Sequence, residues 1–225
     1  MSLFARRRFN RELARLATAH AATPALAAYA AAAWPGEDCP AREAPLLALD
    51  FELDGLRRGA HLLQAGWTAF TATTITLAEA VSCDIRSDAT LDRQAVTIHG
   101  IGEQRASRGE PLGPVIERLV RVLAGRIVVA HAAAIERTAL ADAVRGVFGA
   151  ALPIRTICTL RLEQHIHPGL AESEAYRLGP ARSRYGLPDY AAHDALTDAI
   201  AAGELFQAQL TRLPAGVTLG ALEAI

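Results

Sequence analysis

The most informative pattern of apolar and polar positions along the chain begins at Leu46. A run of apolar residues, LLAL, is followed by acidic residues at every second position, Asp50, Glu52 and Asp54. Successive side chains of a strand point to opposite faces, so this pattern predicts a strand over Leu46–Glu52 with carboxylates on one face. Either the strand reaches solvent at this point, or the buried like charges need protonation, cationic partners or a metal ion.

The remaining pattern predicts further strands and then helices that alternate with strands. Apolar spacing indicates strands over His61–Thr71, Thr74–Val81, Arg126–Ala130 and Ile154–Ile157, and helices over Leu112–Leu123, Ala133–Phe148, Cys158–His165 and Tyr190–Leu210. The early strands are joined closely enough to be antiparallel neighbours. Together these elements predict an α/β fold with a mixed five-stranded sheet that is flanked by helices.

An alanine-rich segment precedes this predicted sheet. Leu3–Ala33 has a helical composition with Pro24 near its middle, which predicts a helical hairpin. The stretch PGEDCP, Pro35 to Pro40, is typical of a linker. We therefore expect an N-terminal helical extension and linker over residues 1–40 and a second unit over residues 41–225. The extension could dock on a partner, pair in a homodimer or cover the sheet.

Composition and charge narrow the function classes. The chain is 51% hydrophobic, as is ordinary for a globular protein, and its net charge is −1. No global basic field would therefore attract a nucleic acid over a long range, although a local site remains compatible with this charge. No stretch approaches the roughly 18 strongly apolar residues of a membrane span. Three cysteines without a CxxC pair favour a reducing compartment, so we expect a cytoplasmic protein with no membrane partner.

Two later segments place polar residues beside predicted strand and helix ends. In RIVVAHAAAIERTAL, Glu136 falls in the first turn of a helix that follows a buried strand, where the helix dipole favours an acid. His193 and Asp198 would lie about 140° apart on one helix, so they share a focus only if His193 lies at the helix start. Asp194 and Asp198 share a helix face and form an alternative acidic pair.

A zinc site is a further alternative for three other residues. Cys158, His165 and His167 are common zinc ligands, but their spacing lacks a matched second pair. An exposed polar loop before Pro168 explains the same residues.

Taken in order, the acidic strand, the acid at the strand-to-helix junction and the last helix resemble the DnaQ-like 3′–5′ exonucleases of the DEDDh group. That group includes the proofreading epsilon subunit of bacterial DNA polymerase III. The resemblance rests on Asp-x-Glu at Asp50 and Glu52 and on His-x4-Asp at His193 and Asp198. Glu136 stands where the family usually has Asp. The resemblance implies a ribonuclease H-like fold over about residues 46–210.

The resemblance also implies a reaction and its cofactors. Two divalent cations, Mg²⁺ or Mn²⁺, would be held by Asp50, Glu52, Glu136 and Asp198, and His193 would be the general base. The expected activity releases nucleoside monophosphates from the 3′ ends of single-stranded DNA or RNA. A DNA polymerase partner is expected by analogy only.

The predicted substrate contacts depart from the family pattern. By resemblance, the residues expected at the nucleotide are Phe51, Leu53, Asp54, Gly55, Leu56, His99 and His131. The family usually has two threonines at Leu53 and Asp54 and an asparagine at Ala132, and Asp54 is expected to bring a negative charge toward phosphate. These departures leave open an alternative, a catalytically degenerate module that binds nucleotides or a protein partner.

Overall fold

A single mixed sheet organises the computed structural model, which describes residues 3–55, 57 and 59–225. The strands are β1 (Leu46–Leu53), β2 (Leu62–Phe70), β3 (Val81–Asp84), β4 (Ile127–Ala130) and β5 (Thr156–Cys158). Their order in the sheet is β3-β2-β1-β4-β5. β1 lies at the centre, antiparallel to β2 and parallel to β4. The predicted α/β fold with a five-stranded mixed sheet is confirmed.

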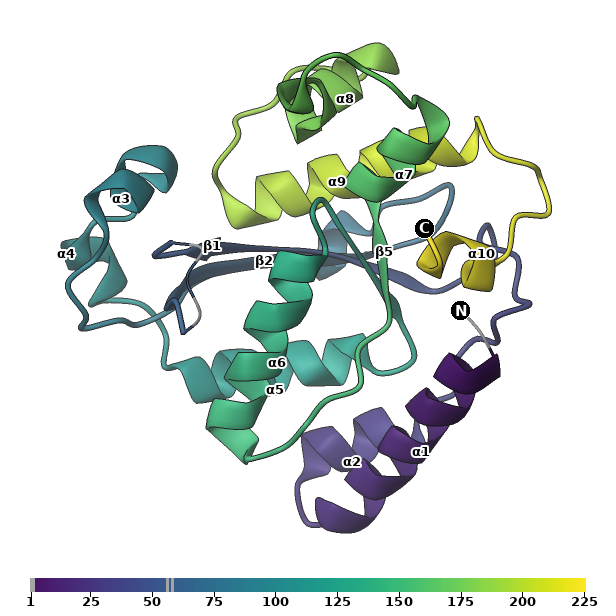
Figure 1. Cartoon of the computed structure of the whole chain (residues 1–225). Helices are drawn as coiled ribbons and strands as arrows, with labels where there is room; N and C mark the ends of the chain where they lie inside the picture. Colours follow the sequence, from purple (N-terminus) through teal and green to yellow (C-terminus); the bar gives the residue numbers. More distant parts are fainter. Residues whose placement is uncertain (1–2, 56, 58) are drawn as a thin grey trace.

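Helices cover both faces of this sheet (Figure 1). They are α1 (Leu3–Ala19), α2 (Pro24–Ala31), α3 (Arg93–His99), α4 (Glu103–Ala106), α5 (Leu112–Leu123), α6 (Ala134–Phe148), α7 (Thr159–Ile166), α8 (Leu178–Arg184), α9 (Ala195–Leu210) and α10 (Leu219–Glu223). Helices α5 and α6 lie on one side of the sheet and α7, α8 and α9 on the other. No helix among the described residues has both the length and the apolar character needed to cross a membrane.

The two faces of β1 carry different side chains. Its odd-numbered residues up to Phe51 belong to the core that α5 and α6 cover. Leu46 and Ala48 point the other way, into the core beneath α9. Asp50 and Glu52 continue this second face, since side chains two apart in a strand share a face. On the α9 side of the sheet, the apolar residues of β1 therefore end at Ala48 and the acidic residues begin at Asp50.

The predicted strand over Thr74–Val81 is wrong. The chain instead turns after β2, forms a short 3₁₀ helix at Leu77–Glu79 and enters β3 only at Val81. Leu77 is 65% exposed. The apolar alternation that suggested a strand therefore does not mark burial here.

The predicted helical hairpin is confirmed and packs on the rest of the chain. Phe9 and Leu13 of α1 and Leu26 and Tyr29 of α2 are buried in the same core as α5. The Tyr29 hydroxyl donates a hydrogen bond to the carbonyl oxygen of Pro153 at 2.6 Å. The extension thus covers the outer side of α5, while a domain boundary after residue 40 remains a prediction.

Candidate active site

The C-terminal half of β1 contributes two carboxylates, a buried one from Glu52 and a half-buried one from Asp50. Burial raises the pKa of Asp50 well above its usual range, and the charges of Glu136, Asp198 and Glu52 raise it further. Burial also raises the pKa of Glu52 to about 7, with the charge of Asp198 as the next cause. Within the part of the chain that the structure describes, no arginine forms an ion pair with Asp50 or Glu52. The strand does not reach solvent with solvated acids, as one expectation allowed.

A third carboxylate comes from the junction of β4 and α6. Ala132 has a left-handed backbone (φ 64°) at this junction, and Glu136 lies in the first turn of α6. Glu136 is 3% exposed, and its Oε2 has no hydrogen-bond partner among the described residues. Burial raises its pKa to about 8, against the effect of a backbone N–H, and the charge of Glu52 adds to the rise. Glu136 therefore belongs to the same acidic cluster as Asp50.

The start of α9 supplies the remaining groups. The helix begins at Ala195 and not at Tyr190, because the side chain of Asp194 caps it by accepting the N–H of Thr197 at 3.1 Å. His193 therefore lies outside the helix. Its backbone is left-handed (φ 70°), a costly conformation for a residue other than glycine. His193 thus lies at the start of the helix, from where its side chain and that of Asp198 in the first turn can point toward the same place.

Asp198 is held in place by its neighbours. The backbone N–H of His193 donates to Asp198 Oδ2 at 2.8 Å. Burial raises the pKa of Asp198, while this N–H and the hydroxyl of Tyr190 act in the opposite direction. The guanidinium of Arg182 lies 5.0 Å from the centre of the Tyr190 ring, and it also donates to the Ala201 carbonyl in α9 at 2.8 Å. The loop before α9 is thereby tied to the helix.

Two residues of β2 fix α9 against the sheet, and sequence reasoning missed both. Gln64 Oε1 accepts the N–H of Ala195 at 2.9 Å, and its Nε2 donates to Asp194 at 3.2 Å. Gly66 pairs with Asp50 in the sheet, and a Cβ atom built on it would overlap the backbone of the first turn of α9. A glycine inside a strand pattern signals such a close approach, so Gly66 could have been found.

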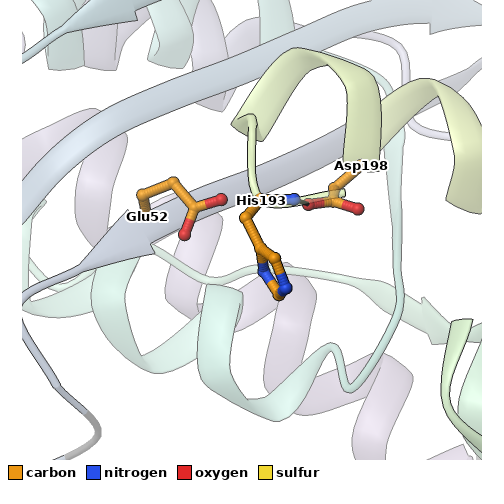
Figure 2. Close-up of side chains that lie close together, drawn as sticks. All are labelled: Glu52, His193 and Asp198. Atoms are coloured by element: carbon orange, nitrogen blue, oxygen red, sulfur yellow. Dashed lines mark hydrogen bonds between the residues drawn. The ribbon is translucent and has the colours of Figure 1, made fainter. Parts of the chain in front are cut away.

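Three of these groups could hold a metal ion. Ligand atoms of Glu52, His193 and Asp198 all lie within 4.8 Å of one another. Figure 2 shows the Glu52 carboxylate pointing from β1 toward the loop that carries His193, with Asp198 approaching from α9. Oxygen donors suit hard cations such as Mg²⁺ and Mn²⁺. Asp50 and Glu136 do not belong to this group of three, although one oxygen of Glu136 has no hydrogen-bond partner among the described residues. The residues present therefore fit a divalent metal centre.

The alternative zinc site is not assembled. Cys158, His165 and His167 do not form a group that could hold a metal ion, although all three lie in the described part of the chain. His167 instead packs its ring against Tyr185, with ring centres 6.0 Å apart, and lies 3.8 Å from Glu163.

The expectation for Asp54 is corrected by the structure. Its side chain is fully buried in the turn after β1, where it accepts from Arg57 and His61 at 3.0 Å each. Burial raises the pKa of Asp54, but these hydrogen bonds and the charge of Arg57 outweigh burial and lower it overall. Asp54 therefore closes a turn and does not direct an unpaired charge toward a phosphate.

Three other predicted contacts, Phe51, Leu53 and Gly55, lie near the end of β1 or shortly after it. The Phe51 side chain lies in the core on the opposite face from the acids, so it does not point into the site. Leu53 and Gly55 line a cavity of about 450 Å³ together with Ile135, the residue before Glu136. Leu56 lies outside the described residues. None of the clustered acids is among the described residues that line this cavity, and Leu53 packs against the core beneath α5 and α6.

The two predicted histidine contacts are largely withdrawn from solvent. His99 is 7% exposed and its Nδ1 accepts the N–H of Ile101 at 3.0 Å, and burial lowers its pKa. His131 lies 2.9 Å from the Thr159 hydroxyl, and burial lowers its pKa to about 4. The Nε2 atoms of both are buried without a hydrogen-bond partner in the described chain. Burial thus disfavours the charged form of both rings.

Comparison with known families identifies the family of this chain. The sequence model of the RNase T exonuclease family matches residues 47–206. The chain belongs to this family. The match begins at the second residue of β1 and ends within α9, so it includes the acids of β1, Glu136 and the start of α9. No curated protein gives a significant sequence match.

Solved structures of the same fold agree with this family. Exonuclease X in complex with 5′-overhanging duplex DNA is 23% identical, with a TM-score of 0.59, and the alignment covers 74% of this chain and 91% of that chain. The zinc-bound complex of Escherichia coli exonuclease I with single-stranded DNA is 16% identical, with a TM-score of 0.65. That alignment covers 76% of this chain but only 41% of exonuclease I. At these identities the likeness shows the ribonuclease H-like exonuclease fold.

Proposed function

We propose that the protein is a metal-dependent 3′–5′ exonuclease of the DEDDh type that hydrolyses phosphodiester bonds at nucleic-acid 3′ ends. One observation carries this proposal: three elements far apart in the sequence bring Asp50, Glu52, Glu136 and Asp198 into one electrostatically coupled cluster next to His193. A fold alone does not keep such an arrangement, because buried like charges destabilise the protein.

The cluster supplies the ligands that this reaction needs. Asp50, Glu52, Asp198 and Glu136 would hold two divalent cations, which when bound activate water and stabilise the developing charge on the phosphate. His193 is exposed on the loop before α9 and is free to take the proton of the attacking water. Its N–H bond to Asp198 holds the His193 backbone beside that carboxylate, and a ring nitrogen lies within 4.8 Å of ligand atoms of Glu52 and Asp198.

The residues around the site favour the binding of the terminal nucleotide of a nucleic-acid strand. The cavity beside Leu53 and Ile135 is lined mainly by apolar side chains, and such a surface suits a nucleobase. The withdrawal of Asp54 into its turn removes the repulsion that the sequence suggested. The expected product is a nucleoside monophosphate from DNA or RNA. A polymerase partner and a cytoplasmic location remain predictions.

A strand-shortening assay tests the proposal. Single-stranded DNA and RNA with a 5′ label are incubated with the protein in Mg²⁺, Mn²⁺ or EDTA, beside Asp50→Asn and Asp198→Asn variants. A ladder that shortens from the 3′ end with metal, and is absent from both variants, supports the exonuclease. A folded protein that gives no ladder with either metal would identify a module that binds without cutting.

A further inference from the structure

Three polar residues form a row across the sheet that begins in the acidic cluster. Glu52 of β1 pairs with Gln64 of β2, and Gln64 pairs with Asp84 of β3. Residues directly opposite each other in antiparallel strands have their side chains on the same face. Gln64 Nε2 also donates a hydrogen bond to Asp84 Oδ1 at 3.2 Å. The row thus leads from a proposed metal ligand to the edge strand β3.

Arg105 of α4 holds the outer end of this row. Its Nε and one terminal nitrogen donate to the two oxygens of Asp84 at 2.6 and 2.7 Å. Such a bidentate pair fixes the orientation of the carboxylate and also neutralises its charge. The hydrogen bond to Asp84 raises the pKa of Arg105 against the effect of burial, and the charges of Asp194 and Glu52 add to the rise. Arg105 therefore places a positive charge near both the row and the residue that caps α9.

Gln64 connects the row to the start of α9. Its Oε1 accepts the N–H of Ala195 at 2.9 Å, so its Nε2 is the atom that faces Asp84 and Asp194, at 3.2 Å each. Two carboxylates that bind one amide nitrogen repel each other unless one of them is neutralised, and Arg105 neutralises Asp84. The orientation of Gln64 therefore depends on an arginine that it does not contact.

Asp194 connects Gln64 to two members of the proposed metal site. Its Oδ2 accepts from Gln64, while its Oδ1 accepts the N–H and the hydroxyl of Thr197 at 3.1 Å each. The main-chain carbonyl of Asp194 accepts the N–H of Asp198 at 2.9 Å, and Asp198 in turn accepts the N–H of His193. A shift of Asp194 therefore displaces both His193 and Asp198.

We propose that Arg105 is a positioning residue of the active site, which holds the start of α9 in place through Asp84 and Gln64. This inference rests on the proposed function, because the groups that it positions are the proposed metal ligands His193 and Asp198. The Arg105 side chain is 44% exposed, and an exposed ion pair contributes little to stability. A change at Arg105 should therefore affect the site more than the fold.

Arg105→Gln tests the proposal in the full-length protein, beside Arg105→Lys, which keeps the charge but loses the planar fork. Mn²⁺ binding is measured by titration calorimetry without nucleic acid. We expect Arg105→Gln to weaken Mn²⁺ binding about 10-fold, the lower end of the effect of residues that orient metal ligands. In EDTA, nuclear magnetic resonance should show faster hydrogen exchange of the Ala195 N–H, because its acceptor Gln64 is no longer fixed. Arg105→Lys should lose less of both.

Arg121→Gln is the matched control. Arg121 is 46% exposed and pairs with Glu117 of α5 at 2.7 Å, and α5 lies on the other side of the sheet from α9 (Figure 1). The control should keep the wild-type Mn²⁺ affinity and Ala195 exchange. Both glutamine variants should melt within about 4 °C of the wild type. Unchanged Mn²⁺ affinity and exchange in Arg105→Gln, or an equal loss in the control, would overturn the proposal.

A double-mutant cycle with Asp84→Asn separates positioning from a direct contact with the substrate or the metal. Because Arg105 acts through Asp84 in this proposal, Arg105→Gln should cause no further loss of Mn²⁺ affinity in the Asp84→Asn protein. Losses that add fully in the double variant would show that Arg105 acts without Asp84, which contradicts the proposal.

Cleavage of a single-stranded oligonucleotide is followed in parallel at saturating Mn²⁺. Arg105→Gln should lower kcat by about 10-fold with KM nearly unchanged. A raised KM with kcat unchanged would indicate a lost contact with the substrate and would contradict positioning. A loss of Mn²⁺ affinity in Arg105→Gln of a protein that never cleaves would support the positioning and contradict the exonuclease. Cleavage with Mn²⁺ affinity and Ala195 exchange unchanged by Arg105→Gln would do the reverse.

Discussion

Two buried glutamates of this protein have opposite surroundings. Glu163 is fully buried and accepts hydrogen bonds from Arg184, Tyr185 and Gln209 at 2.8–2.9 Å. Glu136 is 3% exposed, has an oxygen without a partner among the described residues, and interacts with the charges of Glu52 and Asp50. The first arrangement neutralises a charge within the fold, whereas the second leaves a charge to be neutralised by something else.

The comparison separates structural from functional burial of charge. A buried carboxylate costs stability unless it is paired, and the partners of Glu163 supply that pairing from α8 and α9. At the end of β1 no such cation is supplied to Asp50 within the described chain, and the nearest charges raise its pKa. The cost is consistent with a site whose missing positive charge is a metal ion.

The largest expected effect comes from the acidic cluster. Asp50→Asn should lower the rate of 3′-end cleavage by at least about 10³-fold, because it removes a charged ligand worth several kcal/mol in the transition state. The same change should raise the melting temperature of the metal-free protein, since it removes a repelling charge. Single-turnover cleavage and thermal melting measure the two effects. Glu117→Gln, an exposed acid on α5, is the control and should change neither.

The next effect separates the two glutamates directly. Glu163→Ala should lose about 3 kcal/mol of unfolding free energy, or about 6–12 °C in melting temperature, because it leaves the buried hydrogen-bond donors without an acceptor. Glu136→Gln should instead keep or raise the stability of the metal-free protein while it lowers activity. Melting curves in EDTA test both. Equal destabilisation by the two changes would show that Glu136 is a structural residue.

A smaller effect is expected at the contact between β2 and α9. Gly66→Ala should cost about 2 kcal/mol, because its Cβ forces the first turn of α9 away from the sheet. The shift displaces His193 and Asp198, so kcat should fall by up to about 100-fold. Urea unfolding and kcat measure the two quantities. Gly113→Ala on α5 has open space around it and should leave both unchanged or slightly raise stability.

The smallest effect is a dependence of metal-free stability on pH. Burial raises the pKa of Glu136 to about 8 and that of Glu52 to about 7, from an unfolded value of 4.5. These raised values mean that stability is complete below about pH 4.5 and is lost as the pH rises toward 8. We expect a loss of stability across this window, measured as a fall in the melting temperature of the metal-free protein. In Glu136→Gln the loss should be smaller, and an unchanged loss would place the titration elsewhere.

The sequence predicted the elements that depend on local pattern. The acids of Asp50 and Glu52 follow strand alternation, and the helix of α5 follows a 3.6-residue period over the predicted range. The third strand was misplaced because exposed Leu77 imitates a buried position. The start of α9 was placed five residues early, because Tyr190 continues the apolar pattern while the cap at Asp194 decides the boundary.

The residues that position the site could not be predicted from the local sequence pattern. Gln64 holds Asp194 and Ala195 across 130 residues of sequence, and no periodicity predicts such a contact. The Asp54 side chain points toward Arg57 and His61 within one turn. The composition of this segment does not determine the geometry of that turn.

Metal binding tests the central claim most directly, because that claim is that the acids around Asp50 await a divalent cation. The melting temperature is followed during a titration with Mn²⁺ at about pH 7.5, for the wild type, Asp50→Asn/Asp198→Asn and Glu163→Gln. Saturating metal at about 100 times its dissociation constant stabilises the folded state by about 2.7 kcal/mol, or about 5–11 °C. We predict this rise in the wild type and in Glu163→Gln and its absence from the double variant. An equal rise in all three proteins would contradict the account.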